Sequence, residues 1–310
     1  MTRPSPGWVL ALSLLGISFA GPLVRLSAAD PIAIAVWRLA FSLLIVGVAL
    51  VLTGEWRDWR RLTFRDALFA SAAGAALALH FAAWNASIHL TTIAASVTLV
   101  SLQPAFIVAI SAVFLREAPT RWQLTGIAIA VAGAVIIAAP AWRETGAGFP
   151  SGGNPNAALG NMLAISAAVT AAIYYTIGRH LRARYGIWSY VGLAYSACLV
   201  TLLLMAIVSR APITPQPPRE MAIFVALAIG PMLLGHTGMN WALKYFPAYV
   251  VNLVVLGEPI GATILGALIP GIAQVPSAAT IFGGAVVLAG VAIAARNTVS
   301  SGSNKKEKAV

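Results

Sequence analysis

Ten long apolar runs fill most of this 310-residue chain, and they restrict its possible folds more than any other feature. A bilayer core is about 30 Å thick, so a helix that crosses it needs about 20 apolar residues in a row. The runs lie near residues 8–26, 32–52, 68–88, 93–115 and 122–139 in the first half and near 157–177, 188–208, 221–243, 249–269 and 278–295 in the second. The sequence therefore predicts an all-α integral membrane protein with ten transmembrane helices.

Composition excludes several other classes of protein. With 59% hydrophobic and 9% charged residues, the chain lies outside the range of soluble globular domains. Its net charge of +11 could suggest nucleic-acid binding, but Lys and Arg form short clusters between apolar runs and do not share one helix face. The single Cys198 lies in an apolar run, which excludes a disulfide framework and a CxxC metal or redox motif. We expect no metal and no cofactor.

The distribution of Lys and Arg predicts the orientation, because positively charged loops stay on the cytoplasmic side of a membrane. With the N-terminus inside, 15 of the 20 Lys and Arg residues lie on the cytoplasmic side and four on the outer side. Both termini should then be cytoplasmic. A cleavable signal peptide ending near Ser27 is an alternative for the first run. It would leave nine spans and break the symmetry described next, so we favour a transmembrane helix.

The two halves of the chain repeat the same pattern. Asn85 and Pro104 are separated by the same number of residues as Asn240 and Pro259. The fifth and tenth runs also share two small residues seven apart, which are Gly126 and Gly133 in one and Gly283 and Gly290 in the other. Small residues at this spacing line one helix face and allow close helix contact in lipid.

Each half has five spans, an odd number, so the second half must start on the opposite side of the membrane. This makes the repeat inverted and suits alternating access to a central cavity between the halves. We expect a first repeat in residues 1–142, a periplasmic linker in 143–156, a second repeat in 157–296 and a disordered cytoplasmic tail in 297–310.

These features carry a resemblance to a known family. Leu102-Gln103-Pro104-Ala105, followed by Phe114-Leu115-Arg116-Glu117-Ala118-Pro119-Thr120 and the glycines of the fifth run, resembles the EamA-type motif of the drug/metabolite transporter superfamily. The second half, with Leu256-Gly257-Glu258-Pro259, is similar but weaker. It has Gly271-Ile272-Ala273-Gln274 where the first half has Arg116-Glu117, so the acidic loop residue is not duplicated.

The resemblance implies a small-molecule carrier in the inner membrane of a bacterium. In overall similarity the chain looks most like the bacterial aromatic amino acid exporter group called YddG, which implies export of aromatic and other amino acids. Sugar phosphates, nucleotide sugars and quaternary ammonium drugs are the alternatives within the superfamily.

An intramembrane enzyme, such as a lipid-linked transferase, is the main alternative from another class. Catalysis would require clustered His, Asp or Glu residues, such as an HExxH motif or paired carboxylates. The predicted spans contain no Asp and one Glu, so we do not expect an enzyme. A nucleotide-binding Gly-Lys-Ser/Thr loop is also absent, which leaves facilitated diffusion or proton exchange. A passive pore would need a continuous polar stripe through several spans, and the scattered polar residues argue against one. Ten spans in two halves could close a cavity within one chain, so we favour a monomer.

Polar residues inside the apolar runs are candidates for substrate binding, since an unpartnered polar group in hydrocarbon costs several kcal/mol. Glu258 lies near the bilayer midplane. It could contact a substrate ammonium or take up a proton, or it could stay neutral and bond backbone carbonyls. Arg38 could hold an amino acid carboxylate through two nitrogens, or it could extend to the outer surface, which is the role we favour.

The other candidates lie on matching faces of the predicted helices. His80 and Trp84 are four residues apart and share a face, as do His236 and Asn240 in the second half. Both faces are expected to line the central cavity, although each His could equally bond a neighbouring helix. The remaining candidates, which could either bind substrate or bond helix to helix, are Asn85, Ser96, Gln103, Tyr174, Tyr175 and Trp241.

Overall fold

The computed structural model describes residues 5–114, 120–147, 155–246 and 248–295, and all regular structure within these ranges is helical. Seven helical segments are long and apolar enough to cross a membrane: Pro6–Leu26, Pro31–Thr53, Phe64–Leu90, Ile93–Ile110, Ala157–Arg182, Ile187–Ser209 and Pro218–Ala242. Three shorter apolar helices, Leu124–Ile137, Glu258–Leu268 and Ala278–Gly290, lie in the other predicted runs. The all-α membrane fold is therefore confirmed, whereas the count of ten crossings stays a prediction.

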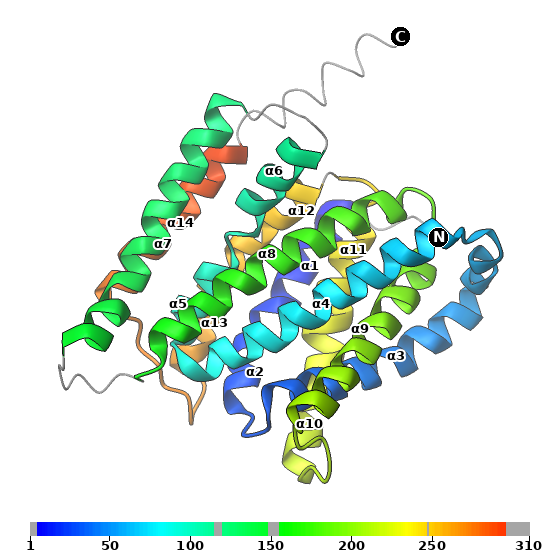
Figure 1. Ribbon diagram of the computed structural model, residues 1–310, viewed down its shortest axis with the longest axis horizontal. Helices are drawn as coiled ribbons and strands as arrows, with labels where there is room; N and C mark the ends of the chain where they lie inside the picture. Colours follow the sequence, from blue (N-terminus) through cyan, green and yellow to red (C-terminus); the bar gives the residue numbers. More distant parts are fainter. Residues whose placement is uncertain (1–4, 115–119, 148–154, 247, 296–310) are drawn as a thin grey trace.

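The first half of the chain contains the elements α1 to α7 in Figure 1. They are α1 (Pro6–Ser18), α2 (Ala20–Leu26), α3 (Pro31–Thr53), the 3-10 helix η1 (Glu55–Arg61), α4 (Phe64–Leu90), α5 (Ile93–Val100), α6 (Gln103–Phe114) and α7 (Arg121–Ala147). The second half contains α8 (Ala157–Arg182), α9 (Ile187–Ser209), α10 (Pro218–Leu227), η2 (Ala228–Thr237), α11 (Gly238–Ala242), α12 (Ala248–Val254), η3 (Val255–Gly257), α13 (Glu258–Leu268) and α14 (Ala278–Ala295).

The two halves interlock, so that each helix of the interior has neighbours from the other half. Helix α4 of the first half packs against α8 and α9 of the second, and α3 also packs against α9. Helix α1 packs against η2, α11 and α13. Any space enclosed at the centre is therefore walled by both repeats, as alternating access requires.

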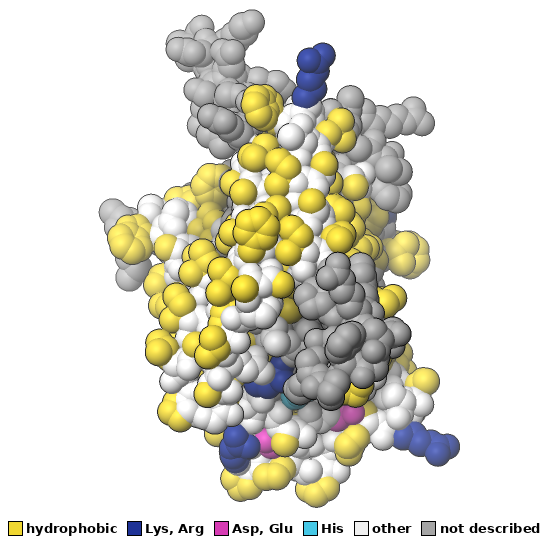
Figure 2. All heavy atoms as spheres, turned by 90° about the vertical axis from the view of Figure 1, so that its left-hand side faces the viewer, with side chains coloured by type: hydrophobic (Ala, Val, Ile, Leu, Met, Phe, Trp, Pro, Cys, Tyr) yellow, Lys and Arg dark blue, Asp and Glu magenta, His cyan; other side chains and the backbone are white. Residues whose placement is uncertain are grey.

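The outer surface is apolar and the interior holds many of the polar groups. Large hydrophobic side chains are exposed along α3 and α9, with Leu52 79% and Val208 85% exposed. Figure 2 shows one side of the molecule covered largely by hydrophobic side chains, with Lys and Arg near its upper and lower ends. Arg38, Asn85 and Asn240 are fully buried instead. This reversal of the soluble pattern is expected where lipid is the solvent.

The repeated glycines bring α7 and α14 into direct backbone contact at the edge of the molecule (Figure 1). A Cβ atom on Gly290 would lie 2.4 Å from the backbone nitrogen of Ala130 and 2.6 Å from the backbone oxygen of Gly126. A Cβ atom on Gly133 would lie 2.6 Å from the backbone nitrogen of Val287. Only residues without a side chain fit at these positions, because backbone atoms cannot rotate aside.

Replacing Gly290 with Leu should separate these two helices and destabilise the protein by about 2 kcal/mol or more. In detergent micelles we expect the Tm to fall by roughly 5 °C. Gly47→Leu is the matched control, because nothing lies within 4 Å of a Cβ atom on Gly47. Equal Tm values for the two variants would contradict the close contact of α7 and α14.

Two helices are interrupted at equivalent points of the repeat. In the first half α5 ends at Val100 and α6 begins at Gln103, and in the second half η3 separates α12 from α13, which begins at Glu258. A proline follows each of these starting residues, and proline is tolerated in the first turn of a helix because its missing N–H would be unbonded there anyway. Each interruption is followed by a buried polar side chain within an apolar run, Gln103 in the first half and Glu258 in the second.

The segment between α10 and α11 departs from a regular α-helix. Residues Ala228–Thr237 form a π-helical stretch, η2, with Pro231 inside it. Proline removes one backbone hydrogen bond and so makes the wider π-helical turn possible. His236 lies in this stretch, and its backbone position therefore depends on an irregular turn that hydropathy did not predict.

Several helices extend beyond the predicted apolar runs; α8, for example, continues to Arg182, beyond the run that was predicted to end near residue 177. Helix α7 continues to Ala147, five residues beyond the predicted end of the first repeat at residue 142. The helix is thus longer than the apolar run, since hydropathy marks the lipid-facing part only. The rest of the predicted linker in 148–154 and the predicted disordered tail in 297–310 lie outside the described residues.

Candidate functional site

A small cavity lies at the centre of the protein, between the two halves. Its volume is about 30 Å³. The lining residues come from the first-half elements α1, α2, α4, α5 and α6 and from the second-half elements α8, η2, α11, η3 and α13; they are Ile17, Ala20, His80, Trp84, Val100, Gln103, Tyr175, His236, Met239, Val255 and Glu258. Both interrupted helices therefore meet at this cavity, each with the polar residue that follows its interruption.

Six of the twelve residues that the sequence proposed for substrate binding line this cavity. They are His80, Trp84, Gln103, Tyr175, His236 and Glu258. The apolar lining residues, such as Ile17 and Val100, were not predicted, because nothing distinguishes them in sequence from residues that face lipid. The cavity thus combines one carboxyl group, two imidazoles, one amide and two aromatic rings in an apolar surround.

Hydrogen bonds restrict the protonation of one imidazole and the position of the other. Nδ1 of His80 lies 2.9 Å from the backbone oxygen of Ala167. A carbonyl oxygen can only accept, so Nδ1 carries the proton and a neutral His80 presents Nε2 as an acceptor. Nδ1 of His236 lies 3.2 Å from the hydroxyl of Tyr175, whose oxygen is also 3.3 Å from the sulfur of Met239.

Aromatic rings cluster at and behind one part of the cavity wall. The rings of His80 and Trp84 are parallel within 5°, with centroids 6.3 Å apart. Phe81 is fully buried behind them, with its centroid 5.2 Å from that of His80 and 5.3 Å from that of His236. Flat walls of this kind accept flat apolar groups.

Two buried polar atoms on the cavity wall have no hydrogen-bond partner among the described residues. They are the indole nitrogen Nε1 of Trp84, which is a donor, and the amide oxygen Oε1 of Gln103, which is an acceptor. Leaving such a group unbonded costs about 1–3 kcal/mol. Both atoms therefore need a partner that enters the cavity, either water or a solute.

Comparison with known families and proteins shows which class of protein contains this cavity. The sequence model of the EamA-like transporter family matches residues 7–139 and 158–296. The chain belongs to the EamA-like transporter family. The family resemblance predicted from the motif in residues 102–120 is thereby confirmed, and the protein is a membrane transporter and not an enzyme.

Two curated relatives of this EamA-like transporter cover almost its whole length. One, from Archaeoglobus fulgidus, is named "Uncharacterized transporter" and is 26% identical over 93% of this chain and 98% of its own. The other, from Streptantibioticus cattleyicolor, is named "Probable terminal-alkyne amino-acid exporter" and is 26% identical over 94% of each chain. A solved structure titled "Crystal structure of protein" shares the fold, with a TM-score of 0.66, 20% identity and coverage of 94% of this chain and 97% of that one.

The EamA-like transporter keeps Arg38 inside the protein. The side chain is fully buried, and its guanidinium carbon lies 4.2 Å from the ring centroid of Phe81. The expectation that Arg38 extends to the outer surface was therefore wrong. Helix α3 packs against α4, and the Arg38 side chain lies against Phe81 of α4 instead of extending to the surface.

Most of the other predicted site residues of the transporter bond to neighbouring helices, and Trp241 contacts a residue of its own segment. Nδ2 of Asn85 donates to the backbone oxygen of Pro31 at 2.9 Å, and the hydroxyls of Ser87 and Ser96 are 2.7 Å apart. In the second half, Nδ2 of Asn240 donates to the hydroxyl of Tyr174 at 2.5 Å, and half-buried Trp241 packs on Tyr245 with centroids 4.6 Å apart. None of them lines the described cavity, and a binding role for them stays a prediction.

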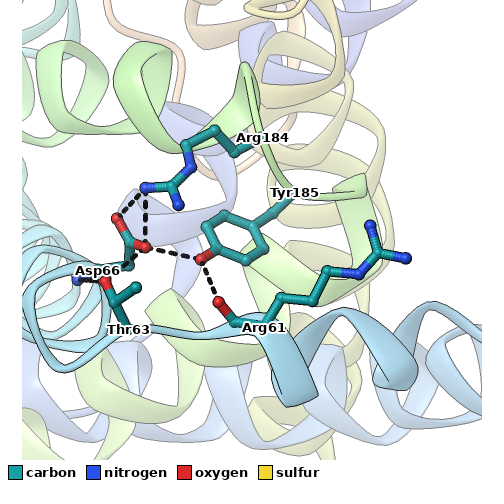
Figure 3. A network of polar contacts seen from close by, with 5 residues as sticks. All are labelled: Arg61, Thr63, Asp66, Arg184 and Tyr185. Carbon is teal, nitrogen blue, oxygen red and sulfur yellow. Dashed lines mark hydrogen bonds and ion pairs between the residues drawn. The ribbon is translucent and has the colours of Figure 1, made fainter.

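A second polar site links the halves of the transporter at the membrane face that carries η1, which we call the η1 face (Figure 3). Asp66 in the first turn of α4 accepts from Arg184 at 2.8 and 2.9 Å and from the hydroxyl of Tyr185 at 2.7 Å. Thr63 donates to the same carboxylate at 2.7 Å. Burial and the adjacent Asp66 carboxylate raise the pKa of Tyr185, so its hydroxyl keeps the proton that it donates.

Acidic residues of η1 extend this link by capping α9. Glu55 accepts from the backbone nitrogens of Trp188 and Ser189 at 2.7 and 3.2 Å, and Asp58 accepts from the backbone nitrogen of Gly186 at 2.8 Å. Carboxylates at a helix N-terminus satisfy its free N–H groups and its dipole. The sequence did not predict a role for these two residues. They lie among arginines that were used only to predict the orientation of the chain in the membrane.

The opposite face of the transporter is also bridged between halves. Glu220 at the start of α10 accepts from the hydroxyl of Ser27 and, at 3.2 Å, from the backbone nitrogen of Ala28. Arg219 donates to the backbone oxygen of Leu26 at 3.0 Å. Contacts between the two halves are therefore present at both ends of the helix bundle.

Proposed function

We propose that this EamA-like transporter exports amino acids, aromatic ones among them, by alternating access to the central cavity. The single observation that supports this most is the meeting of the two interrupted helices. They bring Gln103 and Glu258, from equivalent places in the two halves, into one cavity. Transporters with internal repeats commonly bind their substrates at such interruptions.

The groups in the cavity match the parts of an amino acid. The Glu258 carboxylate can balance the charge of an α-ammonium group. The unbonded oxygen of Gln103 can accept a hydrogen bond from the same ammonium group. The rings of Trp84 and Tyr175, with both imidazoles, offer flat surfaces to an aromatic side chain. The name of the Streptantibioticus relative, an amino-acid exporter, supports the same substrate class.

The cavity must enlarge before it can hold such a substrate. About 30 Å³ has room for roughly two water molecules, far below the volume of a site for an organic ligand. We therefore assign this structure to a closed conformation of the transport cycle. Opening at one face, and then at the other, would expose the same binding residues to each side in turn.

The orientation and setting of the transporter are part of this proposal. The η1 face carries Arg57, Arg60, Arg61 and Arg65, all exposed, and the positive-inside rule makes it cytoplasmic. The inner membrane of a bacterium is the expected location. Both repeats of one chain line the cavity, so the proposed mechanism requires no more than a monomer.

The function can be tested with liposomes that contain only the purified protein. We expect saturable uptake of labelled phenylalanine, with other amino acids competing in order of their fit and aromatic ones strongest. Flux that does not saturate would indicate a pore, and turnover of a lipid would indicate an enzyme. Saturable uptake that only sugar phosphates or quaternary amines inhibit would keep the carrier and contradict the substrate class.

A further inference from the structure

Arg38 is a buried cation that forms no ion pair or side-chain hydrogen bond within the described part of the chain. The side chain is fully buried, and its three guanidinium nitrogens have no hydrogen-bond partner among the described residues. The ion pairs found in the described part of the chain lie elsewhere, at Asp66 with Arg184 and at Glu220 with Arg219. A cation inside a membrane protein is costly unless it is paired, and an unpaired one is a strong sign of function.

The neighbours of Arg38 cover it but leave its donors unused. The ring of Phe81 lies 4.2 Å from the guanidinium carbon, which gives a cation–π contact with the face of the group. The N–H donors lie in the guanidinium plane and are not used by that contact. A carboxylate fits these donors best, because two parallel N–H bonds match its two oxygens.

A single side chain connects Arg38 to the cavity. Phe81 contacts Arg38 and also packs edge to face on His236, with centroids 5.3 Å apart at 82°, and on His80. Both imidazoles line the cavity. Glu258 lines the same cavity, so this cluster holds an acidic group at the cavity and a buried cation that contacts Phe81. Displacement of Phe81 as the cavity opens would join the two regions.

We propose that Arg38 binds the carboxylate of the transported amino acid once Phe81 moves aside, so that the site selects molecules with a free carboxylate. This inference rests on the proposed function and narrows its substrate class. Glu258 at one end and Arg38 at the other match the two charges of a zwitterion. Amines without a carboxylate, and amino acid esters, then lack the partner that Arg38 requires.

The test is binding of phenylalanine and of phenylalanine methyl ester, measured by thermal-shift titration of the detergent-solubilised protein. In the wild type we expect the acid to bind roughly 10- to 100-fold more tightly than the ester. In Arg38→Met this ratio should fall to near one, and in Arg38→Lys it should be intermediate, since a lysine keeps the charge but not the paired geometry.

The stability of the unliganded variants gives a second readout that a structural arginine would not produce. Arg38→Met should raise the Tm, because it removes an unpaired buried charge. The matched control is Arg182→Met, since Arg182 is also buried but bonds the backbone oxygens of Asn240 and Tyr185. That variant should lower the Tm and keep the acid-to-ester ratio of the wild type.

These results distinguish failure of the carboxylate site at Arg38 from failure of the proposed amino acid transport. A wild type that binds acid and ester equally overturns the carboxylate site and leaves amino acid transport standing. An unchanged ratio in Arg38→Met does the same. If neither compound nor any other amino acid binds, the proposed function fails together with this inference.

Discussion

Replacing Glu258 with Gln should lower the affinity for phenylalanine by roughly 30- to 1000-fold. The amide has the shape of the carboxyl group but no charge, so the substrate ammonium would be buried opposite a neutral group. Thermal-shift titration measures the affinity directly, and the initial rate of uptake into liposomes measures its consequence. Glu258 lines the cavity and is buried, so solvent cannot replace the lost charge.

The pH profile of the same variant separates the two roles open to Glu258. If the carboxyl group carries a proton during transport, uptake by the wild type should depend on a pH gradient and uptake by Glu258→Gln should not. If it only binds the ammonium, the variant should be weaker at every pH by a similar factor. Unchanged affinity and an unchanged pH profile would leave Glu258 as a neutral residue bonded to the backbone.

The pseudo-symmetry of the protein provides a matched control. Gln103 begins α6 as Glu258 begins α13, and both line the cavity. The double variant Gln103→Glu with Glu258→Gln moves the carboxylate to the equivalent place in the other half. It should recover part of the affinity that Glu258→Gln loses, because the charge stays in the same small cavity. A double variant no better than Glu258→Gln would show that the position of the carboxylate, and not only its presence, decides binding.

Replacing Asp66 with Asn should favour conformations that are open at the η1 face by roughly 30-fold. The change removes the charge that pairs with Arg184 at 2.8 Å and leaves one acceptor oxygen for the three donors Thr63, Arg184 and Tyr185. Because Arg184 is half exposed, water compensates in part, and we expect a cost of about 2 kcal/mol to the closed conformation. About 1.4 kcal/mol corresponds to a tenfold change in a population.

The measurement is the rate at which a membrane-impermeant maleimide, applied at the η1 face, labels a cysteine in the cavity. Ala20→Cys supplies the cysteine, and Cys198→Ala removes the native one. Asp66→Asn should raise the labelling rate, and Tyr185→Phe, which removes only one hydrogen bond to Asp66, should raise it less. A lower Tm with an unchanged labelling rate would show that Asp66 holds the fold and does not control opening.

Part of the candidate site could be predicted from the sequence, because ionisable and polar residues are costly in lipid and therefore rare in apolar runs. Glu258, His80 and His236 stand out in apolar runs, and the repeat pointed to Gln103 as the counterpart of Glu258. The structure brings all four to one cavity. The π-helical stretch at His236 could have been suspected from Pro231, which interrupts an apolar run.

Asn85 and Asn240 are polar residues of the repeat that do not line the cavity. They mark the repeat as clearly as the cavity residues do, yet they bond Pro31 and Tyr174 in helix contacts. The network of Asp66, Arg184 and Tyr185 was missed for the opposite reason. An acidic residue in the first turn of a helix is ordinary, and nothing local shows that its partners come from the other half.

The membrane class, the apolar runs, the repeat and the family were determined by the sequence alone, since hydropathy and spacing are properties of the chain itself. Which side of each helix faces the cavity was decided only by the tertiary structure. A helix that is apolar all round has no polar face to mark its orientation in the protein. The burial of Arg38 is the clearest case, because it depends on the packing of α3 against α4 and α9, and no pattern within α3 records those neighbours.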